Sequence, residues 1–68
     1  MTLEINGEAK QFETPLTLSA LLEGMGLKAD RVAVELNREI VTRTVWSETN
    51  LSEGDRVEIV HFVGGGAA

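Results

Sequence analysis

The stretch that decides the fold is residues 54–66, GDRVEIVHFVGGG. Apolar and polar residues alternate along its first part, which is the two-residue period of a β-strand with one buried face. The alternation predicts a strand over residues 56–63. Val57 and Ile59 share one face of that strand, opposite Glu58, and we expect this face to contact a hydrophobic core.

The same period turns Val60 and Phe62 to the other face of the strand. Two apolar side chains exposed on a charged surface are typical of a protein-binding site. A loop that covers them is the alternative. We therefore take Val60 and Phe62 as candidate partner-binding residues.

The segment after this strand, residues 64–68, reads GGGAA and has no side chain larger than a methyl group. We expect a flexible glycine-rich tail here and a globular domain over residues 1–63. From Val63, four extended residues reach about 13 to 14 Å, which is enough to enter a narrow active site of another protein. A passive linker is the alternative.

The beginning of the chain predicts a hairpin. Residues 1–5 alternate between apolar and polar, and Asn6-Gly7 follows. This dipeptide favours a two-residue turn because Asn and Gly tolerate positive φ. A second strand over residues 8–12 is expected, ending before Pro15.

A helix is predicted over residues 18–25. Apolar side chains recur there at i, i+3, i+4 and i+7, which forms a single stripe: Leu18, Leu21, Leu22 and Met25. Thr17 suits the N-cap, and Gly26 suits the left-handed position after the helix.

Two further strands are predicted over residues 32–36 and 39–41, joined by a turn at Asn37-Arg38. Residues 42–53 are irregular, and Trp46 within them is expected to cap the edge of the core, with a partner anchor as the alternative. One helix with one apolar stripe is buried most simply against one face of a mixed four- or five-stranded sheet. This order of strands and helix predicts an α+β fold. If the first and last strands lie side by side and parallel at the centre of the sheet, the fold is a β-grasp.

Composition excludes several functions. The 68 residues have a formal net charge of -5 and no Cys, so disulfides, thiolate zinc sites and redox thiols are absent. A small acidic domain argues against a complete enzyme and against nucleic acid as a partner. No apolar run is long enough for a signal peptide or a membrane span, so we expect a soluble cytoplasmic protein without a membrane partner.

Other motifs fail to predict a catalytic or metal site. Residues 24–29, GMGLKA, match a dinucleotide-binding pattern, but they lie at a helix end rather than between a strand and a helix. His61 is the only His, so a site with several His ligands is impossible, and an outward strand position explains it. The acidic residues are dispersed and form no calcium-loop motif. The sequence therefore points away from chemistry performed by the folded domain.

The chain resembles the ThiS family, the ubiquitin-like β-grasp sulfur carriers of thiamine biosynthesis, over essentially its whole length. The resemblance is carried by residues 4–7, 18–22, 32–37 and 40–41, by Trp46 and above all by residues 54–66. It implies a ubiquitin-like β-grasp with a mixed four- to five-stranded sheet on one short helix. It also implies a carrier that is not an enzyme.

In that family a C-terminal glycine is adenylated with ATP and converted to a thiocarboxylate with sulfur from a persulfide donor. By this resemblance Gly66 is the adenylated, sulfur-carrying residue, Gly64 and Gly65 thread into the partner, and Val60 and Phe62 dock. The implied partners are an E1-like adenylating enzyme of the ThiF type and a thiazole synthase of the ThiG type. No cofactor is bound, since ATP and the sulfur donor act through the partners.

One departure from the family pattern is that Ala67 and Ala68 follow Gly66. We expect the chain as written to be inactive until a protease trims the alanines; a cloning artefact and tolerance of the alanines are the alternatives. The fold also permits a carrier for methionine, cysteine or molybdenum cofactor synthesis, or a ubiquitin-like interaction module with a passive tail.

Overall fold

The structure is a computed structural model that describes residues 1–62. The tail expected over residues 64–68, and Val63 before it, lie outside the described residues. The boundary between domain and tail therefore stays a prediction.

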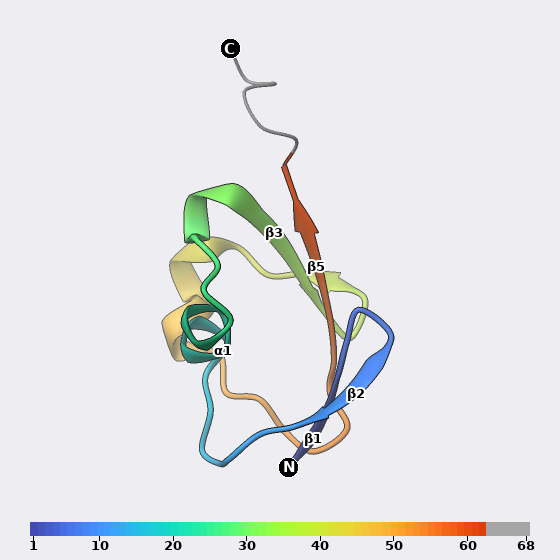
Figure 1. The fold of residues 1–68 in the computed structure, drawn as a ribbon. Coiled ribbons are helices and arrows are strands. Elements are labelled where there is room, and N and C mark those ends of the chain that lie inside the picture. The colour runs from blue at the N-terminus through green and yellow to red at the C-terminus, as the bar shows by residue number, and fades with distance from the viewer. Residues whose placement is uncertain (63–68) are drawn as a thin grey trace.

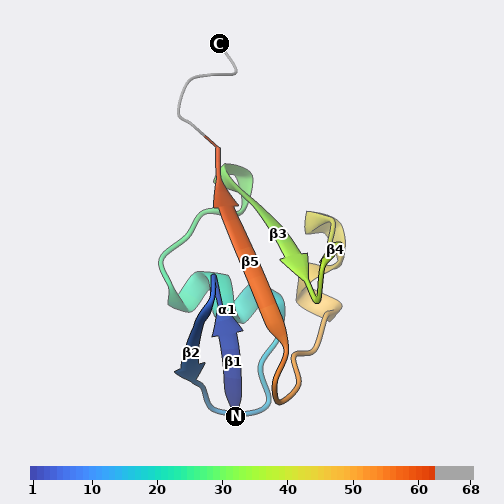
Figure 2. The same cartoon turned by 90° about the vertical axis from the view of Figure 1, so that its right-hand side faces the viewer.

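A mixed five-stranded sheet forms the body of the molecule (Figures 1 and 2). Its strand order is β2-β1-β5-β3-β4. The central pair β1 and β5 is parallel, and the other neighbours are antiparallel. The strands are β1 Thr2–Ile5, β2 Glu8–Gln11, β3 Val32–Leu36, β4 Glu39–Ile40 and β5 Arg56–His61. The predicted sheet, with its first and last strands parallel at the centre, is confirmed.

Both hairpins turn through residues with positive φ. Asn6 and Gly7 have φ of 50° and 86°, and Asn37 and Arg38 have 51° and 74°. Positive φ at both central positions is the geometry of a type I′ turn, which matches the twist of the flanking strands. Both predicted turns are confirmed.

The helix α1, Leu18–Gly24, begins as predicted and ends one residue early. Thr17 is its N-cap, and the Thr17 Oγ1 atom accepts a hydrogen bond from the Ala20 backbone N–H at 3.1 Å. Gly26, with φ of 75°, follows the C-cap Met25. Because the helix stops before Met25, this side chain is 41% exposed, and its predicted place on the buried stripe is wrong.

The irregular segment expected over residues 42–53 contains a 3-10 helix, η2, Arg43–Glu48. Trp46 lies on η2 and is 4% exposed. Its indole Nε1–H donates a hydrogen bond to the Val41 carbonyl at 2.8 Å. Trp46 is thus a core residue with a satisfied donor, and the partner-anchor alternative is wrong.

The core lies between one face of the sheet and the layer formed by α1 and η2, which Figure 1 shows together on one side. A second short 3-10 helix, η1, Ala29–Arg31, precedes β3. The buried side chains are Leu3, Ile5, Leu18, Leu21, Leu22, Val32, Val34, Trp46, Leu51, Val57 and Ile59. In the described part of the chain no helix covers the opposite sheet face (Figure 1).

Three predicted strand ends differ from the structure. β2 stops at Gln11 rather than at residue 12, and β4 stops at Ile40 rather than at residue 41. β5 ends at His61, within the predicted range of 56–63. Backbone hydrogen bonds continue one residue past β2 and β4, from the Phe12 N–H to the Met1 carbonyl and from the Val41 N–H to the Val34 carbonyl.

Candidate docking surface

β5 is the central strand of the sheet, and its two faces have opposite environments. Val57 is 0% exposed and Ile59 is 7% exposed, whereas Val60 is 61% exposed and Phe62 is 58% exposed. The predicted division of this strand into a core face and an exposed face is confirmed. The covering loop considered as an alternative is absent from the described residues.

The backbone that presents these two apolar side chains is held on one edge by β3. Val60 lies opposite Ala33, which is also exposed. The Phe62 N–H donates a hydrogen bond to the Arg31 carbonyl at 2.9 Å. An apolar pair on a paired backbone loses little conformational freedom on binding, which favours association.

Charged side chains lie beside the apolar pair on the same sheet face. Glu58 is directly opposite Glu35 in the β3–β5 register, and Glu35 is in turn opposite Ile40, which is 77% exposed. Like charges directly across a strand pair destabilise a sheet by up to about 1 kcal/mol. This row therefore contributes little to folding.

An ion pair lies one row further from the Phe62 end. The Arg56 guanidinium donates from Nε to Glu4 Oε1 at 2.8 Å, and both side chains are about two-fifths exposed. Exposed pairs of this kind contribute about 0–1 kcal/mol. Arg56 and Glu4 join β5 to β1 on the open face.

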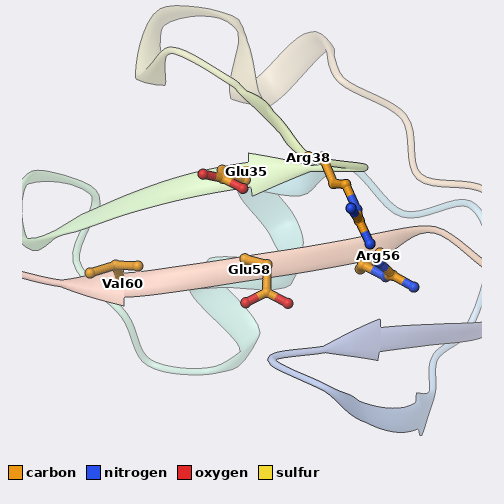
Figure 3. A pocket seen from close by; sticks show the side chains of 5 residues that line it. All are labelled: Glu35, Arg38, Arg56, Glu58 and Val60. Atoms are coloured by element: carbon orange, nitrogen blue, oxygen red, sulfur yellow. The ribbon is translucent and has the colours of Figure 1, made fainter.

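Five side chains on the open face of the sheet line a hollow of about 470 Å³ at β3 and β5. Figure 3 shows the acidic pair between the two arginines and Val60; the lining residues are Glu35, Arg38, Arg56, Glu58 and Val60. The lining of the hollow includes no Ser, Thr, Cys, Lys, Tyr or His side chain. Alternation predicts Glu58 on the face of Val60 and Glu35 outward on its own strand, but it does not bring Glu35, Arg38 and Arg56 together with them, although period 2 puts Arg56 in line with Glu58.

His61 lies at the end of β5 and is exposed, although period 2 puts it on the same face as the buried Val57 and Ile59. Within residues 1–62 no group of three His, Asp or Glu side chains is arranged to hold a metal ion. No helix in the same range is long and apolar enough to cross a bilayer.

The glycines that are expected to take part in the chemistry come shortly after β5 in the sequence. Gly64, Gly65 and Gly66 lie outside the described residues, so their predicted roles rest on the sequence. The structure places the exposed apolar pair Val60 and Phe62 at the end of β5 that leads to them. In Figure 2 this end lies opposite the N-terminus of the chain.

Comparison of the sequence with known protein families shows which family the chain belongs to. The model of the ThiS family matches residues 3–66. The chain belongs to the ThiS family. The match ends at Gly66 and leaves Ala67 and Ala68 beyond it.

Relatives of this ThiS-family chain include both short and long proteins. The sulfur carrier protein ThiS of Bacillus subtilis is 38% identical over 65 residues, covering 94% of this chain and 98% of the relative. A thiazole synthase of Paramagnetospirillum magneticum is 43% identical over 67 residues, covering 98% of this chain and 21% of the synthase. The chain spans about a fifth of the length of such synthases.

A solved structure agrees with the fold. The crystal structure of a thiamine biosynthesis protein (ThiS) from Geobacter metallireducens has a TM-score of 0.83 and 35% sequence identity, covering 97% of this chain and all of that chain. The fold is therefore the ubiquitin-like β-grasp of the ThiS sulfur carriers, as the resemblance implied.

Proposed function

We propose that this ThiS-family chain carries sulfur as a thiocarboxylate on Gly66 and donates it to thiazole formation in thiamine biosynthesis. The observation that supports this most is the family match over residues 3–66, which runs through the docking strand and ends at Gly66. The exposed pair Val60 and Phe62 precedes the glycines, with one residue, Val63, between Phe62 and Gly64.

The chemistry requires activation because a free carboxylate is a poor electrophile. The Gly66 carboxylate attacks the α-phosphorus of ATP, forming an acyl-adenylate and releasing pyrophosphate. The terminal sulfur of a persulfide then attacks the carbonyl carbon and AMP leaves. A thiol breaks the resulting S–S bond, which releases the thiocarboxylate and a disulfide.

The work is divided between carrier and partner. An E1-like adenylating enzyme of the ThiF type supplies the ATP site and stabilises the charge that develops on the phosphate. The chain supplies a reachable carboxylate and a docking surface, and it is not itself an enzyme. This division explains how a chain without Cys takes part in sulfur chemistry.

Thiazole synthase of the ThiG type is the proposed acceptor. Two thiazole synthases contain a stretch similar to nearly all of this chain, at 43% and 42% identity. A carrier and an acceptor joined in one protein act on the same group, which supports thiazole formation over other destinations. Because the first step consumes ATP, we place the carrier in the cytoplasm.

The proposal needs Gly66 to bear the free carboxylate. In the printed sequence Ala67 and Ala68 follow it. A Cβ at these positions would widen a tail that otherwise has none, and glycine fits where the backbone of a protein approaches a ligand closely. The proposal therefore includes hydrolysis of the peptide bond after Gly66 by a protease.

Reconstitution tests the proposed function. The chain truncated after Gly66, and the chain through Ala68, are each incubated with ATP, the adenylating enzyme of the source organism and a persulfide donor. Intact-mass measurement should show a gain of about 16 Da, one oxygen replaced by sulfur, in the truncated chain alone. If neither chain forms an adenylate or a thiocarboxylate, the interaction-module alternative is favoured.

A further inference from the structure

Asn6 does more than allow the first hairpin to turn. Its side chain lies against β5 and makes two hydrogen bonds with one residue that is 53 positions away in the sequence. The Ile59 N–H donates to Asn6 Oδ1 at 2.6 Å, and Asn6 Nδ2 donates to the Ile59 carbonyl at 3.2 Å. The amide therefore occupies both backbone groups of Ile59 on that edge.

These two bonds continue the parallel ladder after β1 has ended. The last backbone rungs run from the Glu4 N–H to the Asp55 carbonyl and from the Asn6 N–H to the Val57 carbonyl, both at 2.9 Å. In a regular parallel pair the next N–H on β5, that of Ile59, would donate to the backbone carbonyl of Asn6. The chain turns at Asn6, where φ is 50°, so the side-chain oxygen takes the place of that carbonyl.

The turn alone does not require asparagine. Glycine adopts positive φ more readily, and aspartate also tolerates it. Asparagine combines this tolerance with an acceptor and a donor on the same side chain, which glycine and aspartate lack. The bonds to Ile59 thus explain the residue type, which the hairpin alone leaves open.

The position of this contact on β5 gives it a consequence for docking. In the part of the chain that the structure describes, Ile59 is the last residue of β5 with hydrogen bonds on the β1 edge, and it lies opposite Val34 of β3. Among the described residues, the strand beyond it is paired with β3 and η1 only, through Ala33, Val32 and Arg31. Figure 2 shows β5 continuing past the β1–β2 turn toward the C-terminus.

We propose that Asn6 is a positioning residue: its amide keeps β5 in line through Ile59, so that Val60 and Phe62 are presented to the adenylating enzyme. This inference rests on the proposed function, because it assigns a cause to the geometry of that docking surface. Asn6 itself touches neither the substrate nor the reacting carboxylate.

The second hairpin provides a matched control. Asn37 occupies the same turn position, with φ of 51°, and its Oδ1 accepts a hydrogen bond from the Arg56 N–H at 2.9 Å. Its Nδ2 donates to Asp55 Oδ1 at 3.0 Å. Asn37 therefore holds the far end of β5 as Asn6 holds the end near Phe62. The two substitutions to glycine preserve the turns and remove two side-chain hydrogen bonds each.

The test compares Asn6→Gly, Asn6→Asp and Asn37→Gly in the chain that ends at Gly66. Amide hydrogen exchange should show faster exchange at Ile59 in Asn6→Gly, by about three- to tenfold beyond any global change, as expected for one lost hydrogen bond. Asn6→Asp keeps the acceptor and should retain protection at Ile59. Asn37→Gly should change exchange at Arg56 and leave Ile59 unaffected.

Adenylation kinetics give the second measurement. Asn6→Gly should raise the KM for the carrier about three- to tenfold with kcat unchanged, because docking weakens while the same carboxylate reacts. Asn37→Gly should leave KM as in the wild type. Equal KM values for the two glycine variants, or unchanged exchange at Ile59, would overturn the inference. If the wild-type chain is never adenylated, the proposed function is wrong. The exchange rate of the Ile59 amide then still shows whether the Asn6 side chain holds β5 in place.

Discussion

The two faces of β5 have similar apolar content and opposite roles. Val57 and Ile59 face the layer formed by α1 and η2 and are buried, whereas Val60 and Phe62 face away from it and are more than half exposed. Alternation along one strand thus separates residues that stabilise the fold from residues available to a partner. Whether an apolar side chain of β5 is buried therefore depends on the layer that covers its face of the strand, rather than on its hydrophobicity.

The largest expected effect is on the core face. Val57→Ala removes two methyl groups from a fully buried site and should lower the free energy of unfolding by about 2 kcal/mol. The matched variant on the open face, Val60→Ala, should change it by no more than about 0.5 kcal/mol. Urea denaturation followed by circular dichroism measures both. Equal losses would show that Val60 is also packed.

A second prediction concerns partner binding by the open face. Phe62→Ala should weaken binding to the adenylating enzyme about tenfold, the loss typical of a buried aromatic anchor, with unfolding nearly unchanged. Calorimetric titration measures the affinity.

Ile40→Ala is the control for Phe62→Ala, because Ile40 is exposed on the edge strand β4, away from the end of β5. It should bind as the wild type does. A large loss of stability in Phe62→Ala would place Phe62 in the core and contradict the division of faces.

The smallest expected effect is that of the ion pair on the open face. Arg56→Gln removes the 2.8 Å contact with Glu4 and should cost less than about 1 kcal/mol of unfolding free energy, because both groups are substantially exposed. Thermal melts at low and high salt test this. The difference between wild type and variant should shrink as salt screens the pair. A difference that salt does not change would indicate packing by the Arg56 side chain instead.

Much of the fold could be predicted because its signals are local. The strand over residues 32–36, the two turns at Asn6 and Asn37 and the N-cap Thr17 each follow from residue types within a few positions. The parallel pairing of the first and last strands at the centre of the sheet was an ordering of this pattern, and the family resemblance agrees with it.

The errors arose where a distant neighbour decides. Met25 fits the helical stripe, but the helix ends before it, and the η2 helix has no simple periodic pattern. The tryptophan at position 46, which was expected at the edge of the core, is fully within it because α1 and η2 pack together.

The candidate site also combines residues that the local sequence predicts with residues that it does not. Val60 and Phe62 could be predicted from alternation within one strand. The row of Glu35 and Glu58, and the bonds from Asn6 to Ile59, depend on the register between segments far apart in the chain. The roles of Gly64, Gly65 and Gly66 stay predictions that the family match supports.

The most direct measurement is the mass of the C-terminal peptide of this carrier, isolated from its native cells during growth without thiamine. We expect a peptide that ends at Gly66. A fraction of it should be heavier by about 16 Da, which is the mass difference between a thiocarboxylate and a carboxylate. Functional protein in which every chain keeps residues beyond Gly66 and none bears sulfur would contradict this expectation.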